Sequence, residues 1–206
     1  MVASVKNVRS PLSKEANPQE LKSNHNIDEI NFHQLSLHDD IGQCSLKEAY
    51  SHFVLDLQGD IPLIIWLLEN PQSVFALPGK VDLYGHDCIH LLLNRGKSNF
   101  DEAFVIGFTM GNCTELKDHH LKIFRMFATK LYPSKFRFNR YHMKSFELGL
   151  AYGESLETKN INQINFDMYS ESKVQTLRES LGINLEELKN VCYAERLWVQ
   201  LEALGQ

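Results

Sequence analysis

The chain has 206 residues and a formal net charge of −5, with 43% hydrophobic and 23% charged residues. These values are ordinary for one globular domain with its own core. The acidic balance argues against a nucleic-acid partner, because phosphate binding needs a basic field. The longest apolar run covers eight residues, 61–68, whereas a membrane-spanning helix needs ~20.

The four cysteines are widely spaced and form no CxxC pair. This usage predicts reduced thiols rather than a disulfide framework or a zinc knuckle. Residues 1–42 are polar and show little apolar periodicity, which predicts a flexible N-terminal arm. The start has no apolar signal core and holds one Arg beside two Glu in its first twenty residues, so it makes a poor mitochondrial transit peptide. We expect residues 43–206 to form a single helical domain.

Helical signals begin at the sequence SLKE, Ser45 to Glu48, which is a capping box. Apolar residues then recur at helical spacing as far as Leu57, and Gly59 is expected to end that helix. A second helix is expected over 61–69; it is apolar on every side and is therefore expected to be buried.

Asp82 is placed to cap a helix that runs to about Asn94 and closes near Gly96. A further capping pattern, from Asn99 to Glu102, starts the next helix, which is again apolar on every side. On that helix Ala103, Gly107 and Gly111 share one stripe. Small residues at this spacing allow another backbone or a ligand to come close, so the stripe indicates either tight helix packing or a ligand-binding surface.

Three more helical segments follow. They are an amphipathic stretch over 121–132, a basic and aromatic stretch after Pro133, and a segment over 171–183 with Gly182 as its C-terminal cap. Asn184 to Glu187 is a fourth capping pattern and starts a last amphipathic helix. The chain shows no βαβ pattern, phosphate-binding loop or internal repeat. The fold class is therefore predicted as all-α, a compact bundle of about seven helices with a flexible N-terminal arm.

Three polar residues on one predicted helix form the main candidate site. At ~100° per residue, His90 projects ~40° from His86 and Asp87 ~100° from it, so all three fit within a third of the helix circumference. Histidines at i and i+4 can bind one metal ion, and Glu102 begins the next helix after a short loop. Two nitrogen and two carboxylate ligands suit zinc or a divalent ion of the iron–manganese group.

A simpler interpretation of the same residues stays open. His86 and His90 are then surface histidines, Asp87 a solvated carboxylate, and Glu102 the N3 member of the Asn99 capping box. The apolar neighbours from Cys88 to Leu93 weaken this interpretation, because polar groups embedded among them need partners.

A second candidate site is the basic run after Pro133. Arg137, Arg140 and Lys144 lie at helical spacing, so we expect three cations on one face. They would contact a phosphate, a lipid headgroup or an anionic membrane surface. The alternative is a solvated helix face with no ligand.

The sequence HDCIH, followed by eleven residues and Glu102, resembles the HDxxH…E signature of the ubiquinone (coenzyme Q) biosynthesis protein family Coq-four. The stretches FELG, FDMY and LRESLGI, between Phe146 and Ile183, are similar in arrangement to that family. Cys88-Ile89 stands where the family often has an aromatic residue, and the helix from Asn184 is an addition. Both departures suggest a bacterial or divergent member.

The resemblance implies a metal, most often zinc, with magnesium, manganese and iron as alternatives, held by His86, Asp87, His90 and Glu102. It implies a polyprenyl lipid or quinone precursor in an apolar cavity, with the Gly107 and Gly111 stripe leaving room for it. The implied activity is a metal-dependent lyase that decarboxylates a polyprenyl hydroxybenzoate, with ring hydroxylation. The implied setting is cytoplasmic, peripheral on the inner face of a membrane, with other quinone-biosynthesis enzymes and a second copy of the chain as partners.

Two other functions remain open at this point. One is a non-catalytic lipid-binding scaffold that organises the quinone-biosynthesis enzymes. The other is an HD-type phosphohydrolase, because His86-Asp87 is an HD pair, although no sequence feature supplies the further His and Asp that such a site needs.

Overall fold

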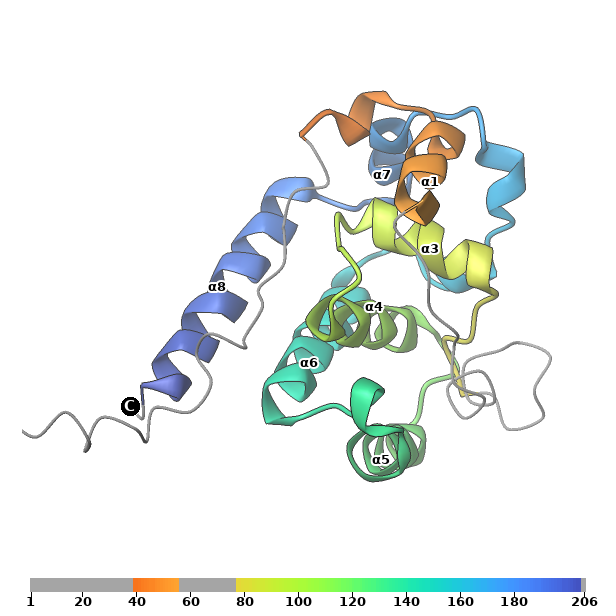
Figure 1. The fold of residues 1–206 in the computed structure, drawn as a ribbon. Coiled ribbons are helices and arrows are strands. Elements are labelled where there is room, and N and C mark those ends of the chain that lie inside the picture. The colour runs from red at the N-terminus through yellow and green to blue at the C-terminus, as the bar shows by residue number, and fades with distance from the viewer. Residues whose placement is uncertain (1–38, 56–76, 205–206) are drawn as a thin grey trace, which may run out of the picture. The chain divides into compact units, whose positions relative to one another are not determined.

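The computed structural model describes residues 39–55 and 77–204, all within one compact unit, Asn31–Gln206. Residues 1–38 of the arm predicted over 1–42, and the predicted helix over 61–69, lie outside the described residues. The domain boundary at residue 42 stays a prediction. The described residues form seven α-helices and no strand, which confirms the expected all-α class (Figure 1). The α-helices are α1 (Leu46–Leu55), α3 (Leu83–Leu92), α4 (Asn99–Asn112), α5 (Asp118–Met126), α6 (Arg140–Ser155), α7 (Val174–Leu181) and α8 (Leu185–Ala203).

Several shorter helical turns connect these elements. The 3-10 turns are Asp39–Gln43, Ser134–Phe136, Ile161–Gln163 and Phe166–Tyr169, and a π-helical turn covers Phe127–Leu131. The π-helical turn divides the helix that the sequence predicted over 121–132. Its Tyr132 N–H donates to the carbonyl of Phe127, five residues back, at 2.9 Å.

Two of the predicted helix starts are confirmed. At α1 the Glu48 carboxylate accepts from the backbone N–H of Ser45 at 2.9 Å, and the Ser45 hydroxyl accepts from the N–H of Glu48 at 3.3 Å. At α3 the Asp82 carboxylate accepts from the N–H of Gly85 at 2.7 Å. The end of α3 differs slightly from the prediction. The left-handed residue after it is Asn94, with φ 53°, rather than Gly96.

The predicted start of α4 is wrong by one residue. The N-cap is Ser98, whose hydroxyl accepts from the N–H of Asp101 at 3.2 Å, while the Asp101 carboxylate accepts from the backbone N–H of Ser98, also at 3.2 Å. This reciprocal pair is the capping box of α4. The Asn99–Glu102 assignment fails because a serine one position earlier takes the cap, so Glu102 is not needed there.

The helix α4 lies between two hydrophobic cores, which explains why it is apolar on every side. Phe104, Val105 and Phe108 belong to the core that α4 shares with α1, α3 and α7. Ala103, Ile106 and Met110 belong to the core that it shares with α5 and α6. Helix α4 is therefore apolar on every side because two of its faces pack against other helices.

The glycines of α4 meet glycines of α6 in a close helix–helix contact. A methyl group added at Gly107 or Gly111 would overlap the carbonyl oxygens of Phe146 or Leu150 on α6. On the other side of the same contact, Gly149 and Gly153 of α6 lie against backbone carbonyls of α4. Of the two interpretations left open by the sequence, the structure supports tight helix packing, because the backbone of α6 fills the space over Gly107 and Gly111.

The start of α6 corrects a second expectation. Asn139 caps the helix by accepting from the N–H groups of Tyr141 and His142, both at 2.9 Å. The helix thus begins at Arg140, and Arg137 precedes it. The prediction that Arg137, Arg140 and Lys144 share one helical face is therefore wrong for Arg137.

The C-terminal elements follow the sequence prediction. Gly182 ends α7 with φ 73°, and Asn184 caps α8 by accepting from Glu186 N–H at 2.9 Å. Arg178 of α7 is buried and donates to the carbonyls of Leu91 and Leu92, both at 2.8 Å. These two bonds give the last carbonyls of α3 a side-chain donor and hold α3 against α7. In Figure 1, α3 lies between α1 and α7 on one side and α4 on the other.

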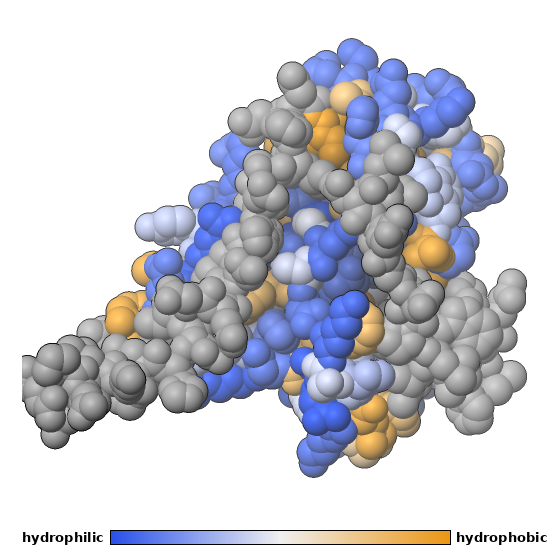
Figure 2. Space-filling view, viewed as in Figure 1, coloured by the Kyte–Doolittle hydropathy of each residue, from blue (hydrophilic) through white to orange (hydrophobic). Residues whose placement is uncertain are grey.

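The surface of the described residues is mainly polar. Figure 2 shows hydrophilic side chains over much of this face, with a hydrophobic patch near α5. Ile123, Met126 and Leu131, in α5 and the turn after it, are exposed. In the part of the chain that the structure describes, no helix has both the length and the hydrophobicity to cross a bilayer.

Candidate metal centre

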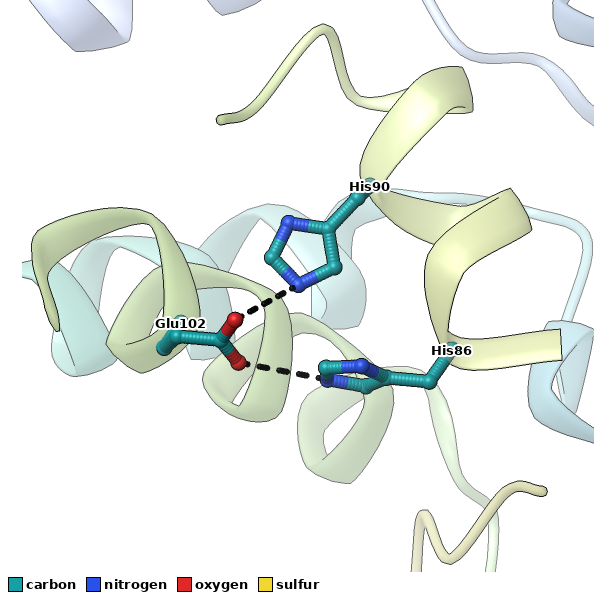
Figure 3. Close-up of side chains that lie close together, drawn as sticks. All are labelled: His86, His90 and Glu102. Carbon is teal, nitrogen blue, oxygen red and sulfur yellow. Dashed lines mark ion pairs between the residues drawn. The ribbon is translucent and has the colours of Figure 1, made fainter. Parts of the chain in front are cut away.

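Three of the predicted site residues converge between α3 and α4. His86 and His90 lie one turn apart on α3, and Glu102 lies in the first turn of α4. Figure 3 shows both imidazole rings pointing toward the Glu102 carboxylate, which lies between them and the body of α4. The i, i+4 spacing places the rings on the same face, with their centroids 4.6 Å apart.

The distances suit a common ligand. His86 Nε2 lies 3.6 Å from Glu102 Oε2, and His90 Nε2 lies 3.5 Å from Glu102 Oε1. One ligand atom from each of the three residues lies within 4.8 Å of the other two. Three such donors can contact one ion after small side-chain rotations, since metal–ligand bonds to nitrogen and oxygen are ~2.0–2.2 Å long.

Three ring nitrogens of the two imidazoles are buried without a hydrogen bond. Neither Nε2 of His86 nor either ring nitrogen of His90 makes a hydrogen bond. The side chain of His90 is only 1% exposed and that of His86 17%, whereas Glu102 is 34% exposed. A buried polar nitrogen without a partner is costly, so this cluster has unused capacity to bind a ligand.

The charges of the cluster are coupled. Burial lowers the pKa of His86 to about 4 despite the nearby Glu102 carboxylate. Burial also lowers that of His90, but Glu102, Asp101 and Asp87 together outweigh this, so the His90 pKa lies above its ordinary value. Burial raises the pKa of Glu102, yet the two histidines lower it more, leaving the pKa below its usual value. Near neutral pH the site therefore holds a carboxylate and a neutral His86, both in the state that binds metals.

Asp87, the fourth predicted ligand, is not part of this group of three. It is buried on α3, at 5% exposure, and burial raises the pKa of its carboxyl. Its oxygens are not among the ligand atoms that lie within 4.8 Å of one another. Direct ligation by Asp87 stays a prediction.

Two basic residues near the site were not identified from the sequence. Lys97 donates to the carbonyl of Phe53, and its charge helps to lower the pKa of both Asp87 and Glu102. Arg95 is buried and pairs with Asp101 and Glu195. In the sequence, Arg95-Gly96-Lys97 is only a short basic turn between the two helices. No local pattern indicates that Arg95 pairs with Glu195 of α8.

The predicted headgroup residues contact other parts of the chain. Arg137 donates to the carbonyl of Tyr132 at 3.1 Å. Arg140 lies 3.8 Å from Glu202 of α8, and Lys144 lies 3.7 Å from Glu147. All three are at or near the surface, and binding of a headgroup there stays a prediction.

A pocket of about 550 Å³ lies near the N-terminal end of α3. Its walls include Lys80, Asp82, Asn162 and Asp167, with Phe166 as an apolar contribution. Neither histidine nor Glu102 lines it. The lining mixes these polar groups with Tyr84, Ile164 and Phe166, so the pocket differs from the wholly apolar cavity that the resemblance implies for a prenyl chain.

The resemblance to Coq-four proteins depends on HDCIH and Glu102, and the structure brings His86, His90 and Glu102 of that pattern together. Comparisons of the chain with protein-family models, with curated proteins and with solved structures find no match. Membership of the family therefore stays a prediction.

Proposed function

We propose that this protein binds one divalent metal ion through His86, His90 and Glu102 and uses it in prenylquinone biosynthesis. The observation that carries the metal site is the convergence of two buried, unpartnered imidazole nitrogens on one carboxylate. A bound ion would satisfy the nitrogens and balance the carboxylate charge.

The donor set favours zinc. Two histidines and one glutamate form the protein ligands of several catalytic zinc sites, which keep a further position open for water or substrate. Iron and manganese also accept imidazole and carboxylate ligands, whereas magnesium prefers oxygen alone and fits less well. The partial exposure of Glu102 leaves one side of the cluster accessible.

Each residue has a defined task in such a site. The neutral imidazole of His86 presents a lone pair without first losing a proton, since its pKa is about 4. His90 has to release the proton that Glu102 stabilises, so metal binding is coupled to proton release. When bound, the metal would supply a Lewis acid that grips and polarises a substrate carboxylate.

The substrate assignment rests on the resemblance. A polyprenyl hydroxybenzoate carries the carboxylate that an open metal position can bind, and its decarboxylation needs an electron sink that a metal provides. The competing function is a scaffold that binds the lipid without turnover. Both functions share the metal site and differ in whether carbon dioxide is released.

Metal analysis of the purified full chain tests the site. We expect about one zinc equivalent per chain, lost in His90→Ala and retained in His52→Ala. His52 is an exposed histidine of α1 and serves as the matched control. Full metal content in His90→Ala would contradict the proposed metal site, whatever the biological role of the protein.

Extraction and turnover separate the two functions. Organic extracts of the purified protein should contain a polyisoprenoid, and zinc-loaded protein mixed with a carboxyl-labelled polyprenyl hydroxybenzoate should release labelled carbon dioxide. Bound lipid without release supports the scaffold. Metal with neither lipid nor release contradicts a role in prenylquinone synthesis and leaves the metal site standing.

A further inference from the structure

Arg95 lies between the two elements that carry the metal ligands. It follows α3 in the short connection to α4, and its side chain is 1% exposed. Its backbone N–H donates to the carbonyl of His90 at 2.9 Å. The main chain of Arg95 is thus fixed directly to one of the two histidines.

The guanidinium of Arg95 reaches the other ligand-bearing helix. Its Nη1 lies 3.7 Å from Asp101 Oδ1 in the first turn of α4. Its Cζ lies 3.7 Å from the centroid of the Phe104 ring, one turn further along the same helix. A cation stacked on a buried ring and facing a carboxylate is held on two sides.

Asp101 connects the position of Arg95 with the orientation of Glu102. Its carboxylate accepts from the hydroxyl of Ser98 at 2.6 Å and from the Ser98 backbone N–H, so it fixes the first turn of α4. Glu102 is the next residue, and the direction of its side chain follows from the orientation of that turn. Arg95 therefore connects the backbone of His90 with the turn that aims Glu102.

The C-terminal helix fixes Arg95 in turn. Glu195 of α8 accepts from Arg95 Nη1 at 2.8 Å and is 4% exposed. Its other oxygen accepts from the hydroxyl of Ser145 on α6. Glu195 lies on the buried face of α8 with Leu188, Cys192 and Val199, so the whole helix holds this carboxylate in place.

We propose that Arg95 and Glu195 are positioning residues for the metal centre, and that α8 sets metal affinity through them. The inference rests on the proposed metal site and adds residues that do not touch the ion. Residues that orient metal ligands from outside the ligand set change affinity by about 10–100-fold when they are replaced. A helix remote from the ligands would thus decide how tightly they hold zinc.

The test uses the full chain and a double variant, Arg95→Met with Glu195→Met. Replacing both members of a buried ion pair by apolar residues often preserves or raises stability, whereas removing one leaves an unpaired charge. The affinity for zinc is measured by competition with a chromophoric chelator. Bound Co²⁺ gives a visible absorption band that reports ligand geometry. We expect unfolding close to the wild-type temperature, zinc affinity lower by about tenfold or more, and a changed cobalt band.

The control is the exposed pair on α5 and α6, Arg125→Met with Glu147→Met, which lies 3.4 Å apart in the wild type. It should leave zinc affinity and the cobalt band unchanged. A single variant, Glu195→Gln, removes the charge but keeps one acceptor oxygen for Arg95, while its NH2 group can donate to the hydroxyl oxygen of Ser145. It decides the question should the double variant not fold. We expect weaker zinc binding in it as well.

Wild-type zinc affinity and an unaltered cobalt band in a folded double variant, or in Glu195→Gln, would overturn the positioning role. A lower unfolding temperature with unchanged affinity would assign the cluster to stability alone and also overturn it. Failure of the wild type itself to bind zinc would instead contradict the proposed function.

Discussion

Asp101 and Glu102 are adjacent carboxylates with separate roles in the first turn of α4. Asp101 pairs with Ser98 and closes the capping box, while Glu102 faces His86 and His90. The sequence prediction placed the capping box at Asn99 and Glu102, because asparagine is a good N-cap residue, as serine is. The choice of Ser98 leaves Glu102 available to bind a metal.

This division predicts different effects for three substitutions. Ser98→Ala should lower the free energy of unfolding by about 1 kcal/mol, because it removes the cap. Asn99→Ala should cost less, since it loses an exposed hydrogen bond to the Lys135 carbonyl. Glu102→Ala should abolish zinc binding. Urea unfolding in the presence of a chelator measures the first two effects, and a zinc titration measures the third. A larger loss for Asn99→Ala than for Ser98→Ala would contradict the assignment.

At the scale of elements, three helix starts could be predicted because their signals are local. Ser45, Asp82 and Asn184 each cap the helix that follows, and Gly182 ends α7 in the left-handed region. Other features depend on packing and have no local signal. The π-helical turn at Phe127–Leu131 belongs to this kind. The stripe of small residues on α4 indicated a close contact, but it did not show that α6 is the partner.

The close contact between α4 and α6 requires a residue without a side chain at position 107. Gly107→Ala would place a methyl group on the Phe146 carbonyl, a backbone atom that no change of rotamer can move. Overpacking of this kind costs about 3 kcal/mol, and the higher helix propensity of Ala returns about 1 kcal/mol. We expect a net loss of about 2 kcal/mol in urea unfolding.

Gly182→Ala provides the comparison for that measurement. No atom lies within 4 Å of the added methyl group there, so only the left-handed φ of 73° opposes it, at a cost of about 1 kcal/mol. A gain of stability in Gly107→Ala would show that helix propensity outweighs packing, and that the two helices separate easily.

At the scale of the whole molecule, the candidate site joins closely spaced residues to an ion pair between residues that are distant in the sequence. The spacing of His86, His90 and Glu102 could be recognised because it is short and periodic. Arg95 could not, since its partner Glu195 is 100 residues away and each looks like an ordinary charged residue on its own helix or loop. Asp87 shared the face expected for a ligand, yet it lies outside the group of three. Sequence spacing therefore identified three side chains that converge and missed the buried ion pair behind them.

Stability of the folded molecule should fall in mild acid, and His142 of α6 is one cause. Its ring meets Phe100 and Phe138 edge-on, with centroids 4.7 and 5.8 Å away, and its Nδ1 accepts from the N–H of Asn139. Burial lowers the pKa of His142 from 6.5 to about 4. Between these pH values the unfolded chain binds a proton that the folded chain does not. The free energy of unfolding therefore decreases as the pH falls through this range.

His142→Gln isolates this contribution, since glutamine can still accept from Asn139 but does not titrate. Metal-free protein is unfolded in urea at a series of pH values from 7.5 to 4.5. We expect the variant to lose less stability over this range than the wild type, whatever its stability at the upper end. His52→Gln, at an exposed position of α1, should follow the wild-type curve. The buried His86 titrates in all three proteins and cancels from the comparison. Burial of the His142 ring against Phe100 and Phe138 disfavours its protonated form in the folded molecule. Parallel curves for His142→Gln and the wild type would contradict this, because they would show that His142 accepts a proton equally readily in the folded and unfolded chains.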